Sequence, residues 1–448
     1  MNFIPDSTKD FDAIKKFLKI KNVKELLPIP DEIYLKEFKS GNIPEKGLPE
    51  KEILKRAQNL ASKNKNIEYY IGAGIYNHYI PAVVDEISSR AEFYTSYTPY
   101  QPEISQGYLQ SMFEYQSIIA RLTSLDISNA SLYDGATSIV EACIMAKRIK
   151  RKDEILIPEN INPEYVSVLK TYNIGNHFKL KFIKTNNGEI NLKEIKNNIS
   201  DETAAVVIQN PNFFGIIENA INISKVVKEA EILLITIFYP LSLGVLISPG
   251  KYNTDIAVAE GQCLGNPPSF GGPGLGIIAT KKEYIRKLPG RIVGITKDIE
   301  GKRGFVLTLQ AREQHIRREK ATSNICSNHA LSALRSLIYL SAIGEEGFKN
   351  ISFLNLKLAH NLCELIIENG IAELKFDRPF FNEFVLKFRD EKALDEFRNF
   401  LKLHNILFGI KLKNYFPEMN DCLLITVTEM NNIEKFKEIC KSYGKIYL

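Results

Sequence analysis

The stretch Asp255–Thr280, DIAVAEGQCLGNPPSFGGPGLGIIAT, decides the fold class of this chain. The apolar run at 256–259 predicts a short buried strand, and a second run at 277–279 predicts another. Gln262 and Cys263 follow the first run, and a turn with four glycines leads into the second. Glycine adopts backbone angles that other residues resist, so this turn is expected to be tight. The stretch therefore predicts two strands joined by a glycine-rich loop.

Short apolar runs alternate with helical segments from about residue 66 to residue 330. The helical segments include 136–148 and 223–230. Strands that alternate with helices indicate an α/β fold with a doubly wound, mostly parallel sheet. The candidate strands are 155–157, 180–183, 204–208, 232–237, 256–259 and 276–279.

The chain has 448 residues, which is too long for one compact core. Residues 1–65 are rich in lysine and have a helical pattern, which predicts an N-terminal arm that packs on another surface. Residues 66–330 are expected to form the large α/β domain. Residues 331–448 mix helices with strands and are expected to form a small α+β domain.

Composition excludes several classes of function. The net charge of +5 is spread along the chain without a basic stripe that contains aromatic residues, so a nucleic-acid partner is not expected. The six cysteines are scattered, without CxxC pairs or nearby histidines at metal-ligand spacing, which argues against a metal site and against a disulfide framework. No apolar run approaches the length of a membrane span, and the N-terminus does not resemble a signal peptide. A cytoplasmic protein is expected.

The segment SLYDGATS at 131–138 places Asp134, Gly135, Ala136 and Thr137 at the start of a predicted helix. Free backbone N–H groups and the positive end of the helix dipole suit a phosphate group. Many helices begin with a similar N-cap that binds no ligand. The segment is therefore a candidate phosphate-type turn or an ordinary N-cap.

The segment YTSYTPYQPEISQG at 94–107 is the densest aromatic region of the chain. Amphipathic rings in a turn-rich stretch suit a pocket wall or an interface, and packing beneath a loop is the alternative. The side chains best placed to form such a wall are Tyr97, Tyr100, Gln101 and Glu103.

Two single residues are interpreted as structural. His78 lies in an aromatic region, but a lone histidine is more often structural than a general base. Cys326 has no convincing basic neighbour or positioned acid in the sequence, so a catalytic thiolate is not expected.

The whole chain resembles the alpha chains (subunit 1) of the two-chain P-protein of the glycine cleavage system. The resemblance rests on seven stretches whose order and spacing match those of the family. The stretches are YIGAGIYNHYIPAVV, AEFYTSYTPYQPEISQG, SLYDGATSIVEA, QNPNFFG, AEGQCLGNPPSFGGPGLG, ATSNICSN and CLLITVTE. The resemblance implies the type I fold of enzymes that depend on pyridoxal phosphate (PLP). It also implies a reaction in which glycine loses its carboxyl group as CO2 and the aminomethyl group passes to the lipoyl arm of the H-protein. PLP acts as the electron sink.

The resemblance assigns PLP and its lysine to the beta subunit, the expected partner of this chain. The lysine position of the family falls here at Gln262 or Cys263. The family also places a carboxylate at the end of the preceding strand, where it keeps the pyridine ring protonated, but the run 235–238 contains no acid. The two departures together predict a chain that has lost the cofactor.

The expected role is therefore an alpha subunit that has no catalytic residue of its own and supplies part of the wall of its partner's site. One alternative is an autonomous PLP enzyme that uses Lys251 or Lys281. The other is a non-catalytic scaffold or regulator that docks the H-protein.

Overall fold

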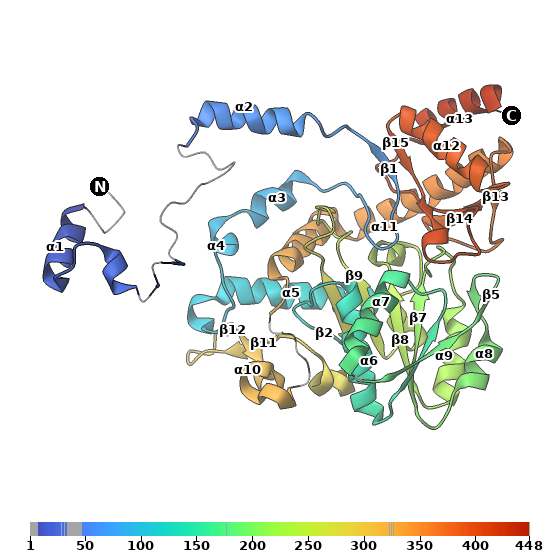
Figure 1. Cartoon of the computed structure of the whole chain (residues 1–448). Coiled ribbons are helices and arrows are strands. Elements are labelled where there is room, and N and C mark those ends of the chain that lie inside the picture. Colours follow the sequence, from blue (N-terminus) through green and yellow to red (C-terminus); the bar gives the residue numbers. More distant parts are fainter. Residues whose placement is uncertain are drawn as a thin grey trace. The chain divides into compact units, whose positions relative to one another are not determined.

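The computed structural model describes residues 8–27, 29–30, 32–33, 47–175, 177–321, 323, 325 and 327–447 (Figure 1). The chain divides into two compact units, Met1–Lys65 and Asn66–Leu448. The predicted division of the chain into three parts remains a prediction.

The described part of the first unit is helical, with α1 (Thr8–Leu18), the 3-10 helix η1 (Val23–Leu26) and α2 (Glu50–Ala61). Both α-helices are amphipathic, but neither buries a single residue, and Phe17 is 84% exposed. Short helices gain most of their stability from packing of an apolar face. The described helices of the arm therefore lack a core of their own.

A seven-stranded sheet forms the centre of the second unit, in the order β2-β10-β9-β8-β7-β3-β4. The strands from β9 to β4 are parallel, whereas β10 runs antiparallel to both of its neighbours. All six predicted strands belong to this sheet, and the predicted α/β, mostly parallel fold is confirmed. The strands are β2 (Ile127–Ser128), β3 (Glu154–Pro158), β4 (Lys179–Ile183), β7 (Thr203–Asn210), β8 (Leu233–Phe238), β9 (Ile256–Glu260) and β10 (Gly276–Thr280).

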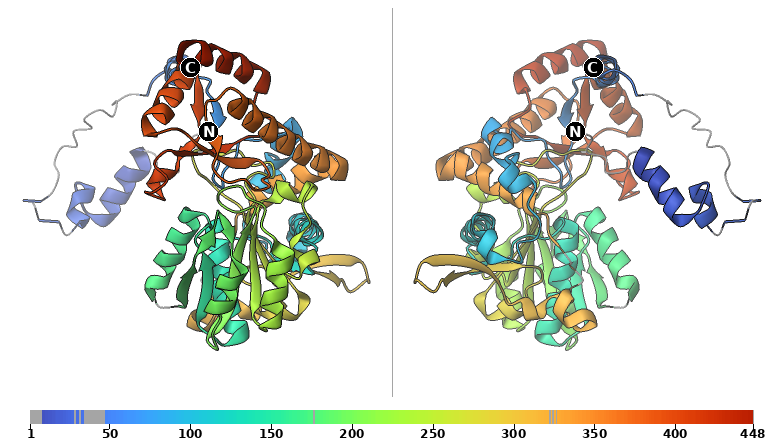
Figure 2. Two further views of the ribbon diagram at one scale, coloured as in Figure 1. Left: turned by 90° about the vertical axis from the view of Figure 1, so that its right-hand side faces the viewer. Right: turned by 90° about the vertical axis from the view of Figure 1, so that its left-hand side faces the viewer.

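Helices cover both faces of the sheet (Figure 2). Ile155 and Ile157 of β3 pack into the core under α6 and α7, while Leu156 between them faces the opposite core under α8 and α9. This alternation follows from the two-residue period of a strand and explains why the runs are apolar throughout. The helices are α3 (Ala82–Ser88), α4 (Ala91–Tyr94), α5 (Gln106–Thr123), α6 (Gly135–Lys150), α7 (Pro163–Tyr172), α8 (Leu192–Asn198), α9 (Ala220–Glu229), α10 (Gln314–Arg317) and α11 (Ala330–Glu368).

The C-terminal part of the second unit has an antiparallel sheet in the order β13-β14-β17-β16 and a separate aromatic core. Strand β1 (Glu68–Tyr70) pairs with β15 (Ile406–Phe408) in this region, although the two are distant in the sequence. The remaining elements are β13 (Glu373–Leu374), β14 (Glu383–Lys387), β16 (Ile410–Lys411), β17 (Cys422–Thr426), α12 (Glu391–Leu403) and α13 (Ile433–Tyr447).

Two hairpins complete the unit: β5 (Thr185–Asn186) with β6 (Glu189–Ile190), and β11 (Ile292–Lys297) with β12 (Arg303–Thr308). The β11–β12 hairpin projects from the body of the unit (Figure 2). Across the described residues, no helix is long and apolar enough to cross a membrane, and no group of three or more potential ligands could hold a metal ion. The cytoplasmic location remains a prediction.

Candidate functional site

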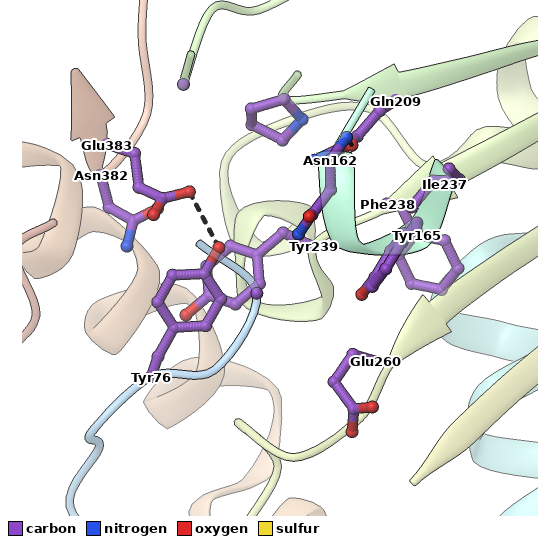
Figure 3. A pocket seen from close by; sticks show the side chains of 13 residues that line it. Tyr76, Asn162, Tyr165, Gln209, Ile237, Phe238, Tyr239, Glu260, Asn382 and Glu383 are labelled. Atoms are coloured by element: carbon purple, nitrogen blue, oxygen red, sulfur yellow. Dashed lines mark hydrogen bonds between the residues drawn. The ribbon is translucent and has the colours of Figure 1, made fainter. Parts of the chain in front are cut away.

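A polar cavity lies at the carboxyl ends of β7, β8 and β9, where α/β folds commonly bind ligands (Figure 3). Its volume is about 30 Å³, whereas pockets for small molecules and cofactors measure roughly 300–1,000 Å³. Its lining includes Tyr76, Asn162, Tyr165, Tyr239, Glu260 and Glu383. The cavity has room for water but not for a cofactor.

The predicted phosphate-type turn forms the start of α6. Asp134 is the N-cap, and its Oδ1 accepts a hydrogen bond of 2.7 Å from the backbone N–H of Thr137. The N–H of Gly135 donates to Oε2 of Glu260 at 2.9 Å. A Cβ atom at position 135 would lie 2.6 Å from the hydroxyl of Tyr165. The N–H groups of Gly135 and Thr137, two of those that suited a phosphate, are therefore taken by carboxylates of the chain itself.

Glu260, the last residue of β9, is the central acid of this arrangement. Its Oε1 accepts hydrogen bonds from the N–H of Gln262 at 2.9 Å and of Leu275 at 2.8 Å. Three backbone donors thus converge on one buried carboxyl group, two of them from the glycine-rich stretch. Burial raises the pKa of Glu260 to about 7, and the backbone donors oppose that rise. A phosphate at the start of α6 would have to displace this side chain.

Gln262 and Cys263, the predicted lysine position, face the protein interior. Gln262 forms two hydrogen bonds with the backbone of Tyr76: its Oε1 accepts from the Tyr76 N–H and its Nε2 donates to the Tyr76 oxygen, both at 2.9 Å. Nε2 also donates to the oxygen of Asn266 at 2.6 Å. Cys263 is buried in an apolar cluster, and burial raises the pKa of its thiol well above the usual value. Gln262 therefore acts as a structural clamp, and Cys263 is an inert core residue.

The preceding strand offers no carboxylate to the cavity. Every residue of β8 is buried, and its contributions to the lining are Ile237 and Phe238. Thr236 points elsewhere and shares a hydrogen bond of 2.8 Å with Thr254. No lysine stands at the end of β9, no acid stands on β8, and Glu260 occupies the N–H of Gly135 at the start of α6. The residues around this cavity therefore do not fit PLP.

An acid–tyrosine network that the sequence analysis missed closes the other side of the cavity. The hydroxyl of Tyr76 donates to Oε2 of Glu383 at 2.8 Å, as Figure 3 shows. The second oxygen of Glu383 accepts from the Ala73 N–H at 2.8 Å and from the Thr426 hydroxyl at 2.7 Å. Burial raises the pKa of Glu383. The sequence does contain a sign of this network, because Glu383 stands at the start of the apolar run NEFVLKF. A charged residue in a buried strand is rarely without a partner.

His78 belongs to a second buried chain of polar groups. Its Nδ1 lies 2.8 Å from Oε2 of Glu429, and its Nε2 lies 2.5 Å from the hydroxyl of Tyr239. The ring of Tyr239 packs against Tyr76 with centroids 4.5 Å apart. His78 thus joins Glu429 in the C-terminal part of the unit to Tyr239, the residue that follows β8, in agreement with the structural interpretation. Cys326 lies outside the described residues.

The four predicted wall residues are exposed, and none of them lines the cavity of this chain. Tyr97 is 85% exposed, while Gln101 and Glu103 also face solvent. Tyr100 is held in place, because its hydroxyl lies 3.3 Å from Nη2 of Arg291 and its ring contacts His315. The structure therefore groups these residues on a surface rather than in this chain's own pocket.

Gln106 ties this surface to the projecting hairpin. Its side chain exchanges hydrogen bonds with the backbone of Phe305 in β12, at 2.9 Å and 2.8 Å. Ile104 on one side and Ile299 at the hairpin tip are 80% and 104% exposed. Segment 94–107 and the β11–β12 hairpin form one partly apolar surface.

Comparisons with known proteins agree over the whole chain. The family described as "Glycine cleavage system P-protein" matches residues 1–443. A probable glycine dehydrogenase (decarboxylating) subunit 1 from Carboxydothermus hydrogenoformans is 45% identical over 448 residues, which cover 99% of each chain. A crystal structure of glycine decarboxylase (P-protein) of the glycine cleavage system, in inhibitor-bound form, matches with a TM-score of 0.87 and 37% identity, covering 99% of this chain and 100% of that one.

A more distant likeness supports the fold alone. Sphingosine-1-phosphate lyase from Burkholderia pseudomallei matches with a TM-score of 0.65 and 13% identity, covering 92% of this chain and 93% of the lyase. The second unit thus shares its fold with this lyase, while the matches that cover nearly the whole chain are named as P-protein or as glycine dehydrogenase (decarboxylating) subunit 1.

Proposed function

The chain belongs to the glycine cleavage system P-protein family, in the subunit 1 form of a two-chain glycine dehydrogenase (decarboxylating), and on this premise we propose that it is the cofactor-free half of that enzyme. The enzyme system depends on PLP, which supplies an electron sink for the carbanion left by decarboxylation. In this proposal the partner subunit holds PLP and its lysine. The complex releases the carboxyl group of glycine as CO2 and passes the aminomethyl group to the lipoyl arm of the H-protein.

The position of Glu260 is the observation that carries this proposal. Its carboxyl group accepts the backbone N–H groups of Gly135 and Leu275, where a phosphate would need those donors. A phosphate placed beside a buried carboxylate would meet like charge in a region of low dielectric. The Gln262 clamp on Tyr76 supports the same conclusion, since a lysine at position 262 would leave the Tyr76 N–H without its acceptor.

The exposed surface of segment 94–107 supports the second half of the proposal. Type I sites lie at the junction of two subunits, so Tyr97, Tyr100, Gln101 and Glu103 are proposed to form part of the wall of the partner's site. Arg291 and His315 hold Tyr100 in this position before any partner binds. An obligate interface of this kind buries about 2,000–5,000 Å² or more.

The autonomous alternative is disfavoured by the positions of the two lysines. Lys281 forms an ion pair with Asp255, the residue before β9 begins. Glu260 lies at the other end of that strand, about 17 Å away at roughly 3.3 Å per residue. Lys251 lies in the 3-10 helix η5 (Pro249–Tyr252), also before β9. Both lysines are therefore at the wrong end of the strand to reach the cavity.

The experiment that tests the proposal uses the chain alone, the partner alone and the co-purified complex. We expect the PLP absorbance band and the borohydride-reduced lysine adduct on the partner only. Glycine–bicarbonate exchange is expected only in the complex. A PLP adduct and exchange activity in the isolated chain would sink the proposal.

Alanine variants separate the wall from a scaffold that merely docks the H-protein. Tyr97→Ala, Tyr100→Ala and Glu103→Ala are assayed in the complex at saturating H-protein, with the exposed helix residue Glu346→Ala as control. The proposal expects lower turnover for the three variants and unchanged turnover for the control. A scaffold would instead leave turnover unchanged once docking is saturated.

A further inference from the structure

A basic groove lies beside α10, and none of its described lining residues lines the cavity at β9. Its volume is about 490 Å³, within the range of roughly 300–1,000 Å³ that is usual for small-molecule sites. Most of the side chains come from α6, α10 and three 3-10 helices: η6 (Lys282–Lys287), η7 (Gln310–Arg312) and η8 (Arg318–Lys320). Six of the nine lining residues are cationic: Arg148, Arg286, Lys287, Arg312, Arg317 and Lys320.

The groove has a large excess of positive charge. No carboxylate is among the lining residues that the structure describes, although Glu283, Glu313 and Glu319 occur in the same segments. Among the described residues, neither Arg317 nor Lys320 has an acidic side chain within ion-pair distance. Like charges that converge on a concave surface repel one another and focus a positive potential into it. An anion in the groove would relieve that repulsion.

The guanidinium groups of Arg148 and Arg312 are held in place by hydrogen bonds to backbone oxygens, and each also has an acidic neighbour, Glu141 and Glu313 respectively. Arg312 is buried, and its side chain donates to the backbone oxygens of Gly290 at 2.8 Å and of Leu309 at 3.1 Å. Nη2 of Arg148 donates to the oxygen of Ala321 at 3.1 Å. Burial lowers the pKa of both arginines. These side chains have lost part of their water shell and are fixed in place before a ligand arrives.

The groove is separate from the cavity that faces Glu260. Glu260 of the cavity accepts a hydrogen bond from Gly135 at the start of α6, whereas Arg148 of the groove lies thirteen residues later on the same helix. At roughly 1.5 Å per residue, the two positions are about 20 Å apart. A ligand in the groove therefore occupies its own site.

We propose that this groove binds a small polyanion that carries two or more phosphate groups. Arginine forks match phosphate oxygens in pairs, and several cations around one pocket favour a multivalent anion over a single carboxylate. The apolar remainder of the lining, Leu309, Ala311 and Ala321, leaves room for an organic part. Inorganic polyphosphate and nucleoside triphosphates share this chemistry. The proposal does not depend on where the enzyme holds PLP.

Isothermal titration of the full chain, alone and in its complex with the partner, tests the site with tripolyphosphate, ATP and adenosine. We expect tripolyphosphate and ATP to bind with affinity that falls as salt rises, and adenosine not to bind. Tighter binding of ATP than of tripolyphosphate identifies a nucleotide as the source, and equal binding identifies the phosphate chain itself. Absence of binding by both phosphate compounds at physiological salt overturns the proposal.

Charge reversal in the groove is compared with the same reversal elsewhere. Arg317→Glu with Lys320→Glu is expected to weaken tripolyphosphate binding by about tenfold or more, since two attractions become repulsions. Lys225→Glu with Lys228→Glu on α9 makes the same change of net charge on another exposed face and is expected to retain most of the affinity. An equal loss in both double variants would mean that net charge alone attracts the ligand, and the site would be rejected.

A measurement on the unaltered protein guards against variants that do not fold. Lys287 and Lys320 are exposed and can be acetylated, and mass spectrometry reports their rates of modification. Tripolyphosphate is expected to slow acetylation at these two lysines and to leave Lys225 unaffected. Protection that is absent, or uniform across all three lysines, contradicts the proposed site.

Discussion

The cavity at β9 and the basic groove at α10 belong to the same unit, but the ionisable side chains that line them differ in sign. The cavity is lined by the acids Glu260 and Glu383, and the groove is lined by arginines and lysines. In the cavity, the N–H groups at the start of α6 already bind Glu260 of the same chain. In the groove, Arg317 and Lys320 face solvent, and no carboxylate of the described chain forms part of the lining. Hydrogen-bond donors that suit an anion therefore predict a bound ligand only where no carboxylate of the protein itself already occupies them.

Burial disfavours charge in both regions, and the two regions respond differently. In the cavity it raises the pKa of Glu260 and of Glu383, so these carboxyl groups hold protons more tightly. In the groove it lowers the pKa of Arg148 and Arg312, but an arginine remains charged at neutral pH. The cavity can become neutral by taking up protons, whereas the groove can become neutral only by binding an anion.

Removal of the internal anion is expected to have the largest effect. Glu260→Ala leaves the buried N–H groups of Gly135, Gln262 and Leu275 without their acceptor. Each buried unsatisfied donor costs about 1–3 kcal/mol, so we expect the free energy of unfolding to fall by about 4 kcal/mol. Urea denaturation followed by circular dichroism measures the change.

Two comparisons sharpen that result. Glu346→Ala, on the exposed face of α11, is expected to change stability by less than about 0.5 kcal/mol. Sulfate is expected to stabilise Glu260→Ala more than the unaltered protein, because the vacated donors can bind an added anion. If sulfate stabilises both proteins equally, the start of α6 is not an anion site that Glu260 fills.

The next effect is a dependence of stability on pH. Burial raises the pKa of Glu141, Glu218 and Glu260 to about 7 in the folded protein, against about 4.3 for a glutamate in an unfolded chain. Between these values the folded protein binds protons that the unfolded chain has released. Each group therefore contributes about 3 kcal/mol to the free energy of unfolding below about pH 4.3. This contribution falls as the pH rises towards 7 and is lost above it.

Urea titrations at a series of pH values between 5 and 8, spanning roughly this interval, measure the slope. Glu141→Gln and Glu218→Gln, which cannot ionise, are each expected to remove part of it, while Glu346→Gln leaves it unchanged. A stability that rises with pH over this interval would show that these carboxyl groups are ionised in the folded protein.

The sequence predicted the sheet well because buried parallel strands are continuous apolar runs. All six predicted strands lie in the seven-stranded sheet, and the two around the glycine-rich loop are neighbours, β9 and β10. The antiparallel direction of β10 was not anticipated, because an apolar run carries no information about its direction. The two-residue strand β2 was too short to give a pattern.

The site was predicted less completely, and distance along the chain explains why. The replacement of a lysine at Gln262 or Cys263 could be seen locally, but the partners that fix Gln262 lie on Tyr76, 186 residues away. Glu383 meets Tyr76 across 307 residues. No local pattern reports such contacts, so the sequence could identify what the cavity lacks but not which side chains had filled it.

The smallest effect is expected in the groove, and its sign distinguishes the two regions. Arg317 has no ion pair within the described part of the chain and lies among other cations. Arg317→Gln therefore removes repulsion without breaking an attraction, and we expect stability to stay the same or to rise by up to about 0.5 kcal/mol. Thermal denaturation at low salt measures this change, and added tripolyphosphate should stabilise the unaltered protein more than the variant. A loss of stability well above 0.5 kcal/mol would mean that Arg317 is held by a partner within the chain. The groove would then resemble the cavity, because the protein itself would already balance the charge of the groove.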